Sequence, residues 1–207
     1  MGPAWQKRLR RGARRFYTLI RSRIEDFEAG PGAVVRRGAV MGGDHGGAIS
    51  LGAGTVIHRG AMLLPYDGFI RLGKRCRVNP YCVLYGHGGL VIGDDVRIAA
   101  QAVIIPANHG MALDGGPMGE QTLTRKGIRI GNDVWIGAGA RILDGSEIED
   151  GCVIAAGAVV RGRLAADGIY AGVPARLLRM REKVMTDFRQ WQDHDDSRDD
   201  QKAVASS

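Results

Sequence analysis

Histidine is the residue type in this chain best suited to proton transfer near neutral pH, because its imidazole has an unperturbed pKa of about 6.5. The sequence contains five histidines, and four stand in weak contexts. His45 and His58 lie in glycine-rich or outward-facing stretches, and His194 lies in an acidic tail. His87 sits between glycines at a local expansion of the chain pattern and could line a cleft. His109 opens the longest aperiodic stretch, where function tends to reside, although a lone loop histidine is more often only exposed to solvent.

A six-residue repeat defines the elements that must position these side chains. Aliphatic residues recur at every sixth position in the second half of the chain: Ile130, Ile136, Ile142, Ile148, Ile154 and Val160. Compact residues follow each aliphatic by four positions: Val134, Ala140, Ser146, Cys152 and Ala158. A period of six fits neither an α-helix nor an alternating strand and is the hexapeptide signature of a parallel β-helix. Three hexads close one coil, and stacked coils bury what a single coil leaves exposed.

The same repeat extends toward the N-terminus with interruptions. Its aliphatic positions there are Leu51, Ile57, Leu63, Leu72, Val78, Leu84, Ile92, Ile98 and Ile104. From Ile92 to Ile130 the chain advances 38 residues, about 20 more than one coil needs. The surplus predicts a loop over residues 107–127 that leaves the prism. We therefore expect an all-β solenoid of about six coils within residues 31–174.

Composition adds few functional constraints. The 207 residues suffice for one domain with a large core. No stretch approaches the roughly 18 apolar residues of a membrane span, and no apolar signal-peptide core follows the N-terminal charges. The cysteines, Cys76, Cys82 and Cys152, occupy inward-facing compact positions, so we expect reduced core residues of a cytoplasmic protein.

The two ends of the chain follow other patterns. Residues 1–30 predict a basic amphipathic helix, whose apolar stripe comprises Trp5, Leu9, Phe16, Ile20, Ile24 and Phe27. Either the stripe packs on the β-helix, or residues 5–24 contact an anionic membrane at the inner membrane face. Nucleic-acid contact is the least favoured interpretation, and we expect none. Residues 175–192 predict a helix that caps the last coil, and residues 193–207 predict a disordered acidic tail.

Four segments resemble one enzyme family over roughly residues 50–180. They are Val78-Asn79 with Cys82; Ala107-Asn108-His109 at the start of the loop; the run from Lys126 to Ala140 that contains Val134-Trp135-Ile136-Gly137; and Ala171-Gly172-Val173-Pro174-Ala175-Arg176. On these segments the chain resembles the hexapeptide-repeat acyltransferases, and within them the maltose/galactoside and polysaccharide O-acetyltransferase group. The resemblance implies a left-handed parallel β-helix, acetyl-CoA as acyl donor and a saccharide acceptor.

The resemblance also implies a catalytic role for the loop histidine. In this family it is the general base, which corresponds to His109 here, and it takes a proton from the acceptor hydroxyl as that oxygen attacks the thioester. No acyl-enzyme is required. Asn79 matches a family asparagine that contacts the histidine or the acceptor, although a corner asparagine also serves to turn the chain. Ala138 matches the position whose backbone N–H faces the thioester oxygen.

Other matching positions imply the groove that holds coenzyme A and the acceptor. Trp135 points outward by its phase in the repeat, and the family places it along this groove. The implied cofactor-binding set is Trp135, Gly137, Ala138, Ala156, Gly157, Arg161, Arg163, Val173, Pro174 and Arg176. The implied acceptor-binding set is Asn79, Tyr85, His87 and Glu120. Gly162 stands where the family often has a lysine, which alters the expected phosphate contact.

The sequence leaves the acceptor and two other functional classes open. The chain looks most like enzymes that modify polysaccharide or lipid-linked saccharide precursors, which act as trimers with sites between prisms, so we expect a homotrimer. An N-acyltransferase acting on an amino sugar or another amine would use nearly the same chemistry. A non-catalytic solenoid scaffold would need neither the loop histidine nor the outward tryptophan. A γ-class carbonic anhydrase needs three histidines on zinc, and without a close histidine pair we expect no metal site.

Overall fold

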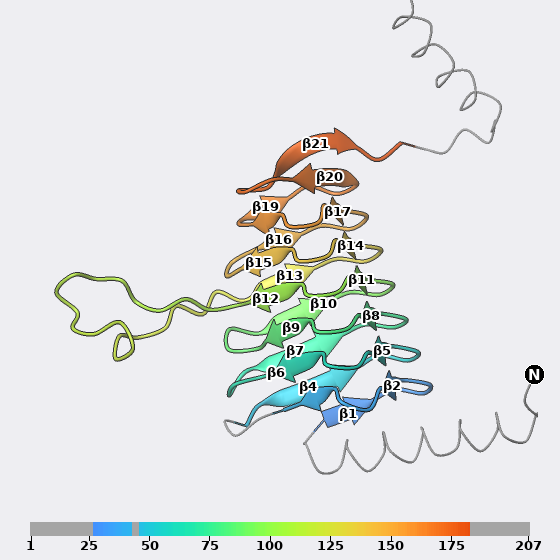
Figure 1. The fold of residues 1–207 in the computed structure, drawn as a ribbon, viewed down its shortest axis with the longest axis horizontal. Helices are drawn as coiled ribbons and strands as arrows, with labels where there is room; N and C mark the ends of the chain where they lie inside the picture. Colours follow the sequence, from blue (N-terminus) through green and yellow to red (C-terminus); the bar gives the residue numbers. More distant parts are fainter. Residues whose placement is uncertain (1–26, 43–45, 183–207) are drawn as a thin grey trace, which may run out of the picture.

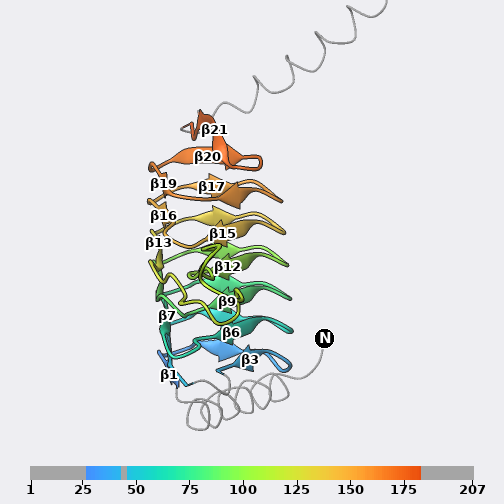
Figure 2. The same ribbon diagram turned by 90° about the vertical axis from the view of Figure 1, so that its left-hand side faces the viewer.

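The structure, a computed structural model, describes residues 27–42 and 46–182. These residues form a stack of short strands arranged in three sheets, whose strands pair in parallel except for the last one, as Figures 1 and 2 show from two sides. Sheet A contains β1 (Phe27–Ala29), β4 (Ala48–Leu51), β7 (Phe69–Leu72), β10 (Leu90–Ile92), β13 (Ile128–Ile130), β16 (Glu147–Ile148) and β19 (Arg163–Leu164). Sheet B contains β2 (Val34–Val35), β5 (Val56–Ile57), β8 (Arg77–Val78), β11 (Arg97–Ile98), β14 (Trp135–Ile136), β17 (Val153–Ile154), β20 (Gly168–Ala171) and β21 (Arg176–Met180). Sheet C contains β3 (Val40–Met41), β6 (Met62–Leu64), β9 (Val83–Tyr85), β12 (Val103–Ile105), β15 (Arg141–Leu143) and β18 (Val159–Val160).

The chain visits the sheets in the order A, B, C, so three strands make one coil. Strands β1–β18 form six coils, and β19 and β20 begin another. The predicted parallel β-solenoid of about six coils is therefore confirmed, while its left-handed sense stays a prediction. No helix within the described ranges is long and apolar enough to cross a membrane.

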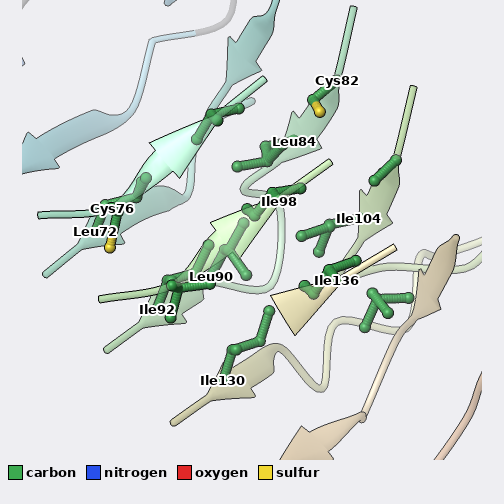
Figure 3. Packing of buried hydrophobic residues seen from close by; sticks show 14 of the residues in the cluster. Leu72, Cys76, Cys82, Leu84, Leu90, Ile92, Ile98, Ile104, Ile130 and Ile136 are labelled. Atoms are coloured by element: carbon green, nitrogen blue, oxygen red, sulfur yellow. The ribbon is translucent and has the colours of Figure 1, made fainter. Parts of the chain in front are cut away.

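The six-residue repeat places one aliphatic side chain of each strand inside the prism. In sheet B the register stacks Ile98 between Val78 and Ile136, so identical positions of successive coils touch. All three side chains are fully buried. Figure 3 shows Ile98 and Ile136 in one interior with aliphatic side chains of the other two sheets. Burying each such side chain contributes about 1.5–3 kcal/mol, which explains how strands of two or three residues persist.

A long loop, residues 106–127, leaves the solenoid between β12 and β13, at the corner that joins sheets C and A. Figure 1 shows it as a single excursion from the stack. Its two arms pair through Asn108 and Thr124, whose backbone hydrogen bonds measure 3.0 and 2.8 Å. The Asp144 Oδ1 atom accepts the N–H groups of Lys126 and Gly127, both at 3.0 Å. The base of the loop is therefore held to the next coil.

The ends of the described chain differ from the sequence prediction. Phe27, assigned to the apolar stripe of a helix, belongs to β1 and pairs with Ile49. The predicted C-terminal helix is wrong over its first part, because residues 176–180 form β21, antiparallel to β20. A strand satisfies the hydrogen-bonding groups at the open edge of sheet B, which a helix would leave unpaired. The remaining predicted terminal segments, residues 1–26 and 183–207, lie outside the described residues.

Candidate active site

His109 lies on the outgoing arm of the loop, one residue after the Asn108–Thr124 bridge. Its side chain is exposed, and its Nδ1 atom lies 3.3 Å from the carbonyl oxygen of Met118, across the loop. A carbonyl oxygen only accepts hydrogen bonds, so this contact requires the proton on Nδ1. In the neutral imidazole the other ring nitrogen, Nε2, then has no proton and can accept one. The loop thus presents an oriented imidazole with one nitrogen available for proton transfer.

Asn79 follows β8 at the corner that joins sheets B and C. Its Nδ2 atom donates to the Ile98 carbonyl at 2.9 Å, and its backbone N–H donates to the same oxygen at 3.0 Å. The side chain therefore ties two coils together. Because His109 leaves from the C–A corner, a single chain holds these two predicted site residues at different corners of the prism.

The segment from Trp135 to Gly139 presents a hydrogen-bond donor at the B–C corner. Trp135 opens β14 and is 56% exposed, as its phase predicts. Ala138 and Gly139 are the central residues of a tight turn, closed by a 3.3 Å bond from the Ala140 N–H to the Gly137 carbonyl. Gly139 has a φ of 66° and donates to the Ala100 carbonyl at 3.0 Å. Within the described part of the chain nothing accepts from the Ala138 N–H, which stays available for a ligand.

The next coil repeats this arrangement at the same corner. Ala156 and Gly157 are exposed, and the Gly157 N–H donates to the Ala138 carbonyl at 2.8 Å. Val173 and Pro174 are also exposed, and the bond from the Ala175 N–H to Val159 holds their segment against β18. The structure therefore brings the predicted coenzyme-binding residues from three successive coils together along one corner.

Three predicted members of the coenzyme set lie elsewhere or serve another purpose. Gly137 is buried, and a Cβ atom there would lie 2.5 Å from the backbone nitrogen of Ala156, so its smallness allows the coils to stack. Arg161 lies at the C–A corner, between β18 and β19, and Arg163 is the first residue of β19 in sheet A. Arg163 forms an ion pair with Glu149, whose pKa is lowered by the hydrogen bond from that arginine.

Arg176 begins β21, and its guanidinium donates to the Ala175 carbonyl at 3.0 Å. Glu120 is exposed on the loop. Neither side chain forms an ion pair among the residues that the structure describes. Both are therefore available to a ligand.

An aromatic cluster lies at the C–A corner in two coils that precede the loop. His87 stacks on Tyr66 with a centroid separation of 4.3 Å, and Tyr85 meets both rings edge-on at 4.9 and 5.6 Å. Tyr66 was not among the site residues predicted from the sequence, and its φ of 48° is unusual for a bulky residue. The spacing from Leu63 to Leu72, nine positions instead of six, is the signal that marks this enlarged corner.

A groove of about 260 Å³ lies beside the base of the loop on sheet A. Phe69, Gly89, Lys126, Arg129 and Glu147 are among its lining residues. None of the predicted site residues lines it. Over the same described ranges, no group of three or more histidine, cysteine or acidic side chains is placed to hold a metal ion.

Comparison with known proteins finds similarity to one family over part of the chain. Residues 127–162 match the family "Bacterial transferase hexapeptide (six repeats)". The chain is 32% identical over 119 residues to the putative lipopolysaccharide biosynthesis O-acetyl transferase WbbJ of Escherichia coli, covering 54% of this chain and 61% of that protein. It is 32% identical over 114 residues to galactoside O-acetyltransferase of E. coli, covering 55% of each. The matches therefore span less than two thirds of either relative.

Among solved structures, a single-residue mutant of AntD, an N-acyltransferase from Bacillus cereus, in complex with dTDP and coenzyme A, has a TM-score of 0.65. It is 21% identical, with 81% of this chain and 91% of that chain covered, so the likeness establishes a shared fold. The chain therefore has a six-residue repeat throughout its core and is similar, over residues 127–162, to the bacterial transferase hexapeptide family.

Proposed function

We propose that this protein is an acetyl-CoA-dependent O-acetyltransferase that modifies a hydroxyl group of a saccharide, within a polysaccharide or a lipid-linked precursor. The observation that carries the proposal is the His109 imidazole, oriented by the Met118 carbonyl with Nε2 available as a base. The two E. coli relatives, both named O-acetyltransferases, support the reaction class.

In the proposed mechanism, acyl transfer is direct. Nε2 of His109 removes the proton of the acceptor hydroxyl as its oxygen forms a bond to the acetyl carbonyl carbon. The C–S bond then breaks, and the departing thiolate of coenzyme A recovers the proton from the imidazolium. The Ala138 N–H, which has no acceptor among the described residues, stabilises the negative charge on the carbonyl oxygen during this step.

The B–C corner suits the coenzyme because its exposed residues are small. The pantetheine arm would run past Ala156 and Gly157, which let it approach the backbone, with Trp135 on one side and the Val173-Pro174 segment on the other. The Arg176 guanidinium would meet a phosphate of the coenzyme. Tyr85 and His87, with Tyr66, would offer aromatic faces to the acceptor saccharide, and Asn79 and Glu120 complete the proposed acceptor set.

The separation of the two corners supports a homotrimer. The base and the coenzyme corner occupy different corners of one prism, so a complete site is formed when the C–A corner of one chain faces the B–C corner of its neighbour. In a ring of three this contact is head-to-tail and closes. Arg161 and Arg163 would then face the neighbouring chain as well.

The test is mass-spectrometric detection of acetyl transfer from acetyl-CoA to sugars, lipid-linked saccharides and amino sugars. His109→Ala should lower the rate by about 10²–10⁴-fold, while His194→Ala, a matched histidine change, should not. Unchanged turnover in His109→Ala would refute the proposed base. Products formed only from amino sugars would make the protein an N-acyltransferase, and failure to bind acetyl-CoA would favour a scaffold.

Two further parts of the proposal concern location. We propose a cytoplasmic protein that contacts the inner membrane face through residues 5–24, which lie outside the described residues. Flotation with anionic liposomes at low salt tests this contact, and a protein that stays unbound would contradict it.

A further inference from the structure

The groove on sheet A is built so that cationic side chains project into it. Register along the outer face places Arg71, Val91, Arg129 and Glu147 on successive strands β7, β10, β13 and β16. With a strand spacing of about 4.8 Å, the backbones of the two arginines stand roughly 10 Å apart; Arg129 lines the groove, whereas Arg71 lies over the Phe69 ring at its edge. Lys126 enters from the base of the loop.

Two glycines shape the walls of this groove. A Cβ atom on Gly89 would lie 2.6 Å from the Phe69 ring, so the missing side chain lets that ring lie over the backbone. The Arg71 guanidinium sits 4.5 Å from the centre of the same ring. Gly145 has a φ of 75°, and its open side accommodates the aliphatic stem of Lys126, whose Cδ would lie 3.1 Å from a Cβ there. The ring and the lysine stem are thus packed against backbone.

The cations of the groove are not neutralised by the chain itself. Among the described residues neither Lys126, Arg129 nor Arg71 forms an ion pair. The neighbouring carboxylate, Asp144, directs Oδ1 to the backbone N–H groups of Lys126 and Gly127. Glu147 is the single acidic side chain that lines the groove, against two lining cations and Arg71 at its edge. The balance of charge favours an anion.

We propose that this groove binds a diphosphate group, and that the acceptor saccharide is carried on such a group. Two lining cations with a third, Arg71, at the edge match two linked phosphates better than one carboxylate, and arginine and lysine are the usual partners of phosphate. The groove adjoins the return arm of the loop that carries His109, so a diphosphate held there would bring its attached sugar toward the base. The role of this groove in catalysis rests on the proposed acyl transfer, whereas diphosphate binding in the groove does not depend on it.

The binding test is calorimetric titration of the full-length protein with inorganic pyrophosphate in the presence of saturating coenzyme A, which occupies any site for the diphosphate of the coenzyme. Lys126→Ala combined with Arg129→Ala should weaken pyrophosphate binding at least about tenfold. Lys74→Ala, an exposed lysine on another corner, should leave it unchanged, and Glu147→Gln should strengthen it. Thermal melts check folding, and the single changes Lys126→Gln and Arg129→Gln serve if the double variant is unstable.

Equal pyrophosphate affinity in wild type and the double variant, or no binding at all, would overturn the inference. The source of the diphosphate is distinguished by comparing UDP-glucose with geranyl diphosphate, since the tighter of the two identifies a nucleotide or an isoprenoid carrier. Acetyl transfer to uncharged sugars without pyrophosphate binding would support the proposed function and refute the diphosphate site in the groove. Groove-dependent pyrophosphate binding without acetyl transfer to any acceptor would support the diphosphate site and refute the proposed function.

Discussion

The three cysteines show how a compact residue of the repeat acquires its chemistry from position. Cys76, Cys82 and Cys152 are buried and free, as predicted, and burial raises the pKa of all three thiols, that of Cys82 to about 11. The reactive species is the thiolate, which at pH 8 is about a thousandth of a thiol with this pKa. We expect almost no reaction of the native protein with Ellman's reagent at pH 8, and three reactive thiols in denaturant. Rapid labelling of the native protein would contradict this assignment.

Gly137 and Gly139 are neighbours whose substitution should have unequal effects. A Cβ on Gly137 would meet only backbone atoms of the next coil, so Gly137→Ala must push two coils apart and should cost about 1–3 kcal/mol. Gly139 faces open space but has a φ of 66°, so Gly139→Ala should cost about 1 kcal/mol. Urea unfolding measures both changes, and equal destabilisation would show that the stacking contact is unimportant.

At the scale of elements, the loop depends on its anchors more than on its own sequence. Asp144 is 9% exposed, and its Oδ1 atom accepts hydrogen bonds from two backbone N–H groups at the base of the loop. Asp144→Ala leaves both donors without their acceptor and should cost about 1–3 kcal/mol, with faster proteolysis within residues 107–127. Asp144→Asn keeps an acceptor oxygen and should remain close to wild type.

The matched comparison is the ion pair between Arg125 and Asp67, which links the same loop to an earlier corner. Its N–O distance is 3.0 Å, but both side chains are substantially exposed. Arg125→Ala should therefore cost less than about 1 kcal/mol. If urea unfolding and limited proteolysis show Arg125→Ala to be the more damaging change, Asp144 is not the main anchor.

The six-residue repeat predicted the coils because each interior position is fixed by burial, and burial leaves a periodic trace. Ile98 and Ile136, for example, occupy the same position of successive coils and are paired in neighbouring strands. Counting hexads also places Arg161 one residue beyond the sheet C aliphatic Val160, at the C–A corner, although resemblance grouped it with Ala156 at the B–C corner. Strand β21 has no periodic pattern, because its side chains are all exposed and it forms by backbone pairing with the open edge of β20. Sequence periodicity reports burial, and edge pairing depends on backbone groups shared by all residues.

At the scale of the whole molecule, the separation of His109 from the Ala138 corner makes a prediction about mixing. In the proposed trimer each site takes its base from one chain and its coenzyme corner from the next. His109→Ala removes the base, and Ala156→Trp fills the exposed coenzyme corner, so each variant alone should be inactive. When the two are co-refolded in equal amounts, a site works if its base donor carries His109 and its other chain carries Ala156. Each condition is met with about even odds, so about a quarter of the sites should regain activity.

The experiment measures acetyl transfer after co-refolding, with refolded wild type as the reference and light scattering to establish the mass. Because the working sites in mixed trimers have an intact base and an intact corner, their Michaelis constant for acetyl-CoA should match that of wild type. Mixed trimers that stay inactive would show that both groups come from one chain, and the prism corners would then have to be bridged by the loop itself. A monomer mass at micromolar concentration would remove the shared site directly. Recovered activity at about one quarter would instead show that His109 on the loop of one chain and the Ala138 corner of the next chain act together in one site of the trimer.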